Sequence, residues 1–75
     1  MEATVEVGGV RYYVEALDLD RLHANLAATF EEALELRRHA ARNREEPQWT
    51  EKAVAAEKLY GQLRQLIDAK REQVA

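Results

Sequence analysis

The 75-residue sequence contains no cysteine, only one proline and only three glycines. The absence of cysteine excludes disulfide bonds, thiolate metal ligands and a cysteine nucleophile. The sequence also lacks an apolar run long enough for a transmembrane helix, and it begins with the acidic Glu2 and not with the basic residues of a signal peptide. We therefore expect a cytoplasmic protein with no membrane partner.

An excess of one charge is also missing. Lysine and arginine number 11 against 14 aspartates and glutamates, which leaves a net charge of -3. Such a mixed surface favours neither nucleic acid nor a membrane as the partner of the whole chain. A chain of this length forms one domain, residues 1–75, and rarely buries a large core alone, so that oligomerisation is a common remedy.

Residues 4–15 are predicted to form a β-hairpin. Gly8-Gly9 supplies a two-residue turn that requires positive φ at both positions. With the turn there, the strands place apolar side chains on one face and polar ones on the other. The apolar face consists of Val5, Val7, Val10, Tyr12 and Val14. This face is expected to pack on helices, and the alternative is that a strand edge pairs with a second copy.

A long helix is predicted from about residue 19 to residue 43. Asp18 or Asp20 is expected to cap its N-terminus, and Pro47 favours the first turn of a following helix. Apolar residues recur at alternating steps of three and four, with Thr29 as a polar exception. The members of this stripe are Leu19, Leu22, Leu26, Ala33, Leu36 and Ala40, flanked by Phe30 and Leu34.

A second helix, about residues 47–73, carries the stripe around which the chain is organised. Its members are Trp49, Ala53, Ala56, Tyr60, Leu63, Ile67 and Val74, interrupted by Lys70 and widened by Leu59 and Leu66. A stripe of this width needs more than one neighbour to cover it. The connector between the helices, residues 44–46, is short, so that the two helices are expected to be antiparallel neighbours.

These elements predict an α+β fold in which a β-hairpin lies on a long antiparallel helical hairpin. The β-hairpin is too small to cover both stripes, and we therefore expect a homodimer or higher oligomer with a four-helix core. The predicted core and oligomer interface consists of Leu26, Phe30, Trp49, Ala56, Tyr60, Leu63, Leu66 and Ile67.

A basic cluster closes the first helix, and it suggests an alternative function. Arg37, Arg38, Arg42 and Arg44 could contact phosphate in a dimeric nucleic-acid-binding protein. Cations at a helix C-terminus also stabilise the macrodipole, and Glu35 is positioned to pair with Arg38 or His39. We favour the interpretation that these arginines stabilise the helix, and nucleic acid is not the expected partner.

The sequence provides little for catalysis. Glu31, Glu35 and His39 share one helix face, yet they lie on the polar side of the stripe, which favours a solvated charged surface over a metal site. Neither a nucleophile–base arrangement nor a glycine-rich phosphate loop is present. We expect a protein that is not an enzyme and that uses no cofactor, metal or small-molecule substrate.

Two further residues leave alternatives open. Gly61 stands in the middle of the second helix, where it marks either the close approach of another backbone or a tolerated surface glycine. Trp49 is expected to close the end of the helical pair near the connector, and the alternative is a hot spot for a partner.

Two segments carry a family resemblance. Residues 5–15, Val-Glu-Val-Gly-Gly-Val-Arg-Tyr-Tyr-Val-Glu, and residues 50–56, Thr-Glu-Lys-Ala-Val-Ala-Ala, are similar to the head of ZapA, a small bacterial cell-division protein family that associates with the FtsZ ring. The asparagine-containing run of that family is replaced here by Glu57-Lys58-Leu59. The resemblance implies dimers and tetramers formed through the second helix and an association with cell division.

The predicted function is that of a small, non-catalytic, homo-oligomeric interaction module that presents a surface to another protein as a regulator, adaptor or scaffold. Besides the nucleic-acid alternative, the apolar stripes are also typical of an accessory subunit or a fragment of a larger assembly.

Overall fold

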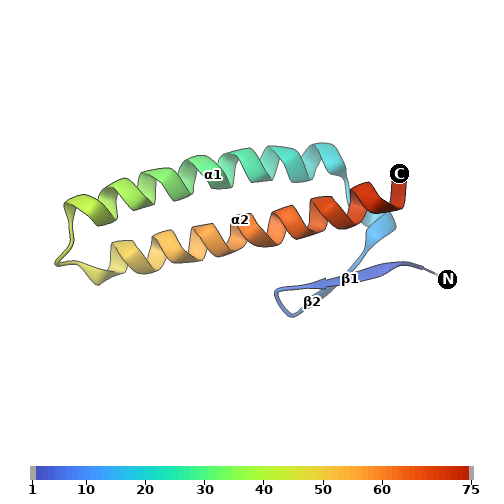
Figure 1. Cartoon of the computed structure of the whole chain (residues 1–75), viewed down its shortest axis with the longest axis horizontal. Helices are drawn as coiled ribbons and strands as arrows, with labels where there is room; N and C mark the ends of the chain where they lie inside the picture. Colours follow the sequence, from blue (N-terminus) through green and yellow to red (C-terminus); the bar gives the residue numbers. More distant parts are fainter. Residues whose placement is uncertain (1, 75) are drawn as a thin grey trace.

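Two strands, one 3₁₀ turn and two long helices make up the part of the chain that the structure describes (Figure 1). The computed structural model describes residues 2–74, with the side chain of Val74 outside the description, so that the last predicted member of the second stripe is not placed. The elements are β1 (Thr4–Val7), β2 (Val10–Tyr13), η1 (Val14–Ala16), α1 (Leu19–Arg42) and α2 (Pro47–Val74). The predicted α+β arrangement of a β-hairpin and an antiparallel helical hairpin is confirmed.

The strand register follows from the glycine turn. Gly8 and Gly9 have φ values of 61° and 79°, in the left-handed region that lets a two-residue turn match the twist of its strands. Val5 pairs with Tyr12 and Val7 with Val10, which is the predicted register.

The second strand ends two residues earlier than predicted. Val14 and Glu15 belong to the 3₁₀ turn η1, in which the Leu17 amide donates to the Val14 carbonyl at 3.1 Å. The turn directs the Val14 side chain into the protein, where it is 4% exposed. The Val14 amide still donates to the carbonyl of Ala3 at 3.0 Å, which continues the register of the β-hairpin by one residue and keeps Val14 on its predicted apolar face.

Local hydrogen bonds define the ends of α1. The Asp18 carboxylate accepts from the Arg21 amide at 3.2 Å and so satisfies one of the free N–H groups of the first turn. At the other end, the side-chain amide of Asn43 donates to the carbonyl of His39 at 2.8 Å. The predicted cap and the predicted end of the helix are both confirmed, with Asp18 chosen over Asp20.

The two helices pack along a seam of mostly small residues. In α1 the buried residues beyond Leu22 are Thr29, Ala33 and Ala40, and α2 contributes Ala53 and Ala56. Thr29, the polar exception of the stripe, is thus inside the seam at 7% exposure. Small side chains let two helices approach closely, but they bury little apolar area.

The molecule is elongated, with extents of 51 × 22 × 14 Å and a radius of gyration of 14.9 Å. A compact domain of this length is expected to have a radius of gyration of roughly 11 Å. Neither helix contains, within the described residues, an apolar stretch long enough to cross a membrane.

The large buried side chains gather at the end of the helical pair where the β-hairpin lies (Figure 1). The buried cluster there consists of Val7, Leu22, Leu63, Leu66 and Ile67. Partly buried side chains surround it, namely Val5, Tyr12, Leu17, Leu19 and Leu26. The β-hairpin runs beside the C-terminal half of α2 only, so that among residues 2–74 no element covers the half of the helical pair nearest the connector (Figure 1).

Lys70 has a structural role although it interrupts the apolar stripe. Its ammonium group donates to the carbonyl of Val14 at 3.1 Å and to that of Glu15 at 3.4 Å. These carbonyls belong to η1, and the lysine therefore joins the end of α2 to the turn between the β-hairpin and α1. The apolar stem of the side chain can still pack along the seam.

We predict that Lys70→Met lowers the free energy of unfolding by about 1–2 kcal/mol, because hydrogen bonds from a charged donor are lost while the apolar stem is kept. Urea denaturation followed by circular dichroism measures the change. Arg71→Met is the matched control, since Arg71 is exposed and is expected to leave stability nearly unchanged. Equal stability of the two variants would contradict this role.

Candidate interaction surface

Large apolar side chains remain exposed on the described part of the chain. They are Val10, Tyr13, Phe30, Leu34, Val54 and Leu59, each at least 42% exposed. Single exposed apolar residues are common on protein surfaces, whereas a contiguous group indicates an interaction site. Four of the six lie on the helices, and the depressions that Phe30, Leu34 and Leu59 line separate these three residues into two faces.

The first of these, the phenylalanine face, consists of Leu26, Ala27, Phe30, Leu34 and Tyr60. Two adjoining depressions are lined by these residues. Phe30 is 48% exposed, and its ring contacts that of Tyr60 with centroids 5.7 Å apart. This contact aligns the middle of α1 with the middle of α2. The face is therefore a shallow apolar surface, centred on an aromatic pair and aligned mainly along α1.

An ion pair borders the phenylalanine face at the end nearer the connector. The guanidinium of Arg37 donates to both carboxylate oxygens of Glu57 at 2.7 and 2.6 Å. The hydrogen bonds and the positive charge of Arg37 hold the pKa of Glu57 below its ordinary value, and the same pair raises the pKa of Arg37. Both side chains are close to half exposed, so that water and salt weaken the attraction.

The second, the tryptophan face, consists of Leu36, Trp49, Ala55 and Leu59. A depression of this face is also bordered by Glu32 and Lys52. Leu59 is 46% exposed, whereas Leu36 and Trp49 are partly buried. Opposite charges on the border and apolar residues in the centre are typical of a surface that binds protein.

The β-hairpin covers the continuation of the tryptophan face along α2. Ala55, Leu59, Gln62 and Leu66 are spaced by four, three and four residues and therefore share one side of the helix. The turn of the β-hairpin lies at Gln62, whose side-chain amide is close to Gly8. Leu66 is buried behind the turn, whereas Leu59 lies beyond it and stays exposed.

Most of the predicted interface residues are fully or partly buried within a single chain. Ala56, Leu63, Leu66 and Ile67 are buried. Leu26, Trp49 and Tyr60 are partly buried, and Phe30 is the one predicted interface residue that is exposed. Leu34 and Leu59 are exposed as well, and their positions on the flanks of the stripes were the signal for this that the sequence offered.

Trp49 closes the end of the helical pair near the connector. Its ring stacks on His39 with centroids 4.8 Å apart, and the Lys52 ammonium lies 5.0 Å from the ring centroid. The indole N–H donates to the Glu46 carboxylate at 2.8 Å. These contacts hold the connector against both helices, which agrees with the expected closing role of this residue.

The basic cluster is divided by its ion pairs. Arg37 pairs with Glu57, and Arg38 pairs with Glu35 at 2.8 Å. The sequence had offered Arg38 and His39 as partners of Glu35, and the structure places Arg38 there. Arg42 and Arg44 lie at the connector with Glu45 and Glu46, and all four line the same depression. Carboxylates thus accompany each part of the cluster and reduce the positive potential that it presents.

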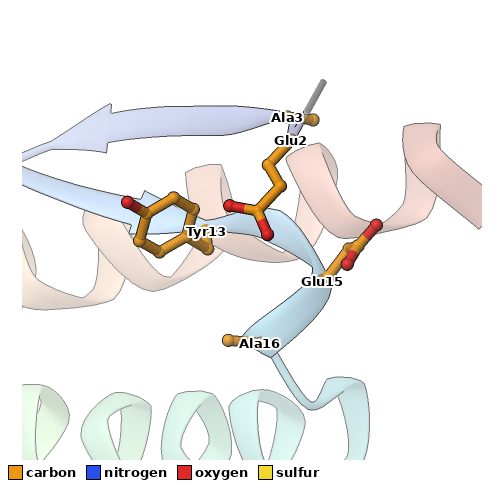
Figure 2. A pocket seen from close by; sticks show the side chains of 5 residues that line it. All are labelled: Glu2, Ala3, Tyr13, Glu15 and Ala16. Carbon is orange, nitrogen blue, oxygen red and sulfur yellow. The ribbon is translucent and has the colours of Figure 1, made fainter.

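The acidic residues of the described part of the chain do not gather into a metal-binding site. Among residues 2–74 no group of three or more histidines, aspartates or glutamates is placed to hold a metal ion. A surface depression at the open end of the β-hairpin is bordered by Glu2, Tyr13 and Glu15, whose side chains Figure 2 shows around it. Both glutamates are exposed to solvent, where an ion pair with a ligand contributes little free energy.

The comparisons with known proteins return no relative: no protein-family model, no curated protein and no solved structure matches the chain.

We predict that the stabilising effect of Glu57 depends on pH. Its folded-state pKa lies below the unfolded value, so that the ion pair stabilises the fold above the pKa of an unfolded glutamate, about 4.3. This contribution is lost as the pH falls through the lower, folded-state pKa. Glu57→Gln should therefore lower the urea midpoint slightly at pH 7, and this deficit should shrink as the pH falls towards 2.

Glu51→Gln on the same helix is the matched control, because the described structure shows no ion pair for Glu51. It should behave as the parent protein does at both pH values. An equal deficit of Glu57→Gln at pH 7 and at pH 2 would contradict the assignment to the ion pair.

Gly61 has open space around it. A Cβ atom built at this position meets no atom within 4 Å, so that no close approach within the chain requires glycine. We predict that Gly61→Ala raises the free energy of unfolding by about 0.5–1 kcal/mol, because alanine restricts the unfolded chain and favours the helix. Thermal unfolding of dilute protein tests this, and a lower melting temperature would indicate a neighbour that excludes the methyl group.

Proposed function

We propose that the protein is a small, non-catalytic, self-associating interaction module that presents a surface to another protein as a regulator, adaptor or scaffold. The observation that supports this most directly is the exposure of Phe30, Leu34 and Leu59 on a helical pair whose β-hairpin covers only one end. A single chain leaves these side chains in water, where they oppose stability. A second copy or a partner protein would bury them.

The distribution of apolar area favours self-association as the first step. Burying the exposed half of a phenylalanine is worth roughly 1–2 kcal/mol, and a leucine contributes somewhat less. Sums of this size over two copies are comparable to a large part of the stability of a small domain. Dimerisation would thus supply what the alanine-rich seam between the helices lacks.

A role in cell division is the specific form of this proposal. It is supported by the resemblance of residues 5–15 and 50–56 to the ZapA head, together with a β-hairpin that has the predicted register. In this form the protein is a bacterial cytoplasmic scaffold, and its partner is the FtsZ filament. Co-sedimentation of the purified protein with FtsZ filaments tests it, with filament-free protein as the control.

The two alternatives have less support. Nucleic-acid binding would rely on four arginines, two of which are already paired with Glu57 and Glu35. An accessory subunit of a larger assembly would use the same apolar faces. Unlike the proposed self-associating module, it would aggregate as an isolated chain and form no defined oligomer.

We predict a concentration-dependent dimer or higher oligomer in sedimentation equilibrium at micromolar concentrations. Phe30→Glu should weaken it at least tenfold, because each copy would bury a charge in place of an aromatic ring. Ala28→Glu is the matched control, since Ala28 is exposed on the same helix and belongs to neither face. A parent protein that stays monomeric over the whole concentration range would overturn the proposed function.

A further inference from the structure

The two halves of the helical pair are held together by buried side chains of very different size. In the half nearest the connector, the buried residues are Thr29, Ala33, Ala40, Ala53 and Ala56. At the β-hairpin end they are Val7, Val14, Leu22, Leu63, Leu66 and Ile67. The free energy gained on burial is roughly proportional to the apolar area removed from water, and a leucine buries several times the area of an alanine. The seam of the connector half, residues 31–59, therefore contributes little to stability.

Side-chain contacts between the helices add to this seam. The Arg37–Glu57 ion pair is close to half exposed, and ion pairs of this kind contribute little. At the end of the pair, the Trp49 ring stacks on His39 with centroids 4.8 Å apart, and its indole N–H donates to the Glu46 carboxylate at 2.8 Å. We call His39, Glu46 and Trp49 the latch, because they join the last turn of α1, the connector and the first turn of α2.

We propose that the helical pair opens at the connector end while the β-hairpin end stays folded, and that the latch controls how often it opens. Proteins open locally in cooperative units, and the units with few buried apolar contacts open at a lower free energy than the whole fold. The connector half is such a unit. Its opening is a property of a single chain and does not depend on the proposed self-association.

The Phe30–Tyr60 contact marks the boundary of the opening. The ring centroids are 5.7 Å apart, and from this point on large side chains join the helices. Leu63 belongs to the buried cluster of the β-hairpin end, and Leu26 packs against that cluster. On the connector side of the boundary α1 continues for about 18 Å, to Arg42. Helical segments of this length are marginally stable in water without a neighbour, so that separation also exposes their backbone amides to exchange.

The opening separates the residues of the tryptophan face. Leu36 belongs to α1, whereas Trp49, Ala55 and Leu59 belong to α2, and one depression joins them in the closed form. A partner protein that contacts both sides of this depression binds the closed form more tightly than the open form, and its binding shifts the equilibrium towards closure. Most of the phenylalanine face lies on α1 alone. The latch therefore controls the tryptophan face more strongly than the phenylalanine face.

Hydrogen exchange of backbone amides tests the opening by comparing segments that are equally far from the helix ends. The connector segments are residues 33–38 of α1 and residues 53–58 of α2. The hairpin segments are residues 23–28 and 63–68, at the same distances from the opposite ends of these helices. After correction for the intrinsic rate of each amide, the connector segments should exchange at least about tenfold faster than the hairpin segments. Their exchange should depend less on urea, because the opening exposes less surface than global unfolding.

A conservative variant separates local opening from global unfolding. Ile67→Val removes one methylene group from the buried cluster, which stays folded in the open form. The variant should therefore speed exchange of the hairpin segments about two- to tenfold and leave the connector segments unchanged. Equal acceleration of all four segments would overturn the proposal, because exchange would then occur only through global unfolding.

The role of the latch has a test of its own. Glu46→Ala removes the acceptor of the indole N–H, a hydrogen bond that is absent from both the open and the unfolded forms. Exchange should therefore become about three- to tenfold faster in the connector segments and in the hairpin segments. Glu45→Ala is the matched control, since Glu45 is exposed in the same connector and the described structure shows no ion pair for it. Connector segments that exchange equally fast in both variants would overturn the role of the latch.

Discussion

The contact of Val7 with Leu63, Leu66 and Ile67 is the interaction on which the structure depends, because it is where the β-hairpin meets the helices. Leu22 of α1 joins the same cluster, so that all elements are held together at one end. In the remaining half of the helical pair the buried seam consists of alanines and Thr29. An alanine buries about one methyl group, whereas a leucine contributes about 1.5–3 kcal/mol on full burial. Stability is therefore concentrated at the β-hairpin end.

This uneven distribution explains why apolar surface remains. Small residues occupy the positions that point from one helix to the other, and the large residues Phe30, Leu34 and Leu59 are left on the flanks, where a single neighbouring helix does not reach them. The β-hairpin reaches as far as Gln62 and leaves Leu59 uncovered. A surface of this kind suits a protein whose function is to bind other copies or other proteins, and this links the composition of the seam to the proposed function.

Local features were readable in the sequence because their causes are local. The glycine pair sets the register of the β-hairpin, Asp18 caps α1, and Pro47 begins α2, each through hydrogen bonds or backbone angles within a few residues. In the sequence, Lys70 appears only as an interruption of the apolar stripe of the second helix. Its function depends on two carbonyls more than fifty residues earlier in the chain, and no local pattern indicates such a contact.

The sequence by itself determined which elements form, their order, and the presence of more apolar helix surface than a β-hairpin can cover. Only the tertiary structure decided which apolar residues are buried inside the chain and which stay exposed. Leu26, Phe30 and Leu66 look alike in a helical stripe, yet Leu66 lies beneath the β-hairpin whereas Phe30 is exposed. The physical reason is that periodicity fixes the side of a helix on which a residue lies, whereas burial depends on which element reaches that side at that height.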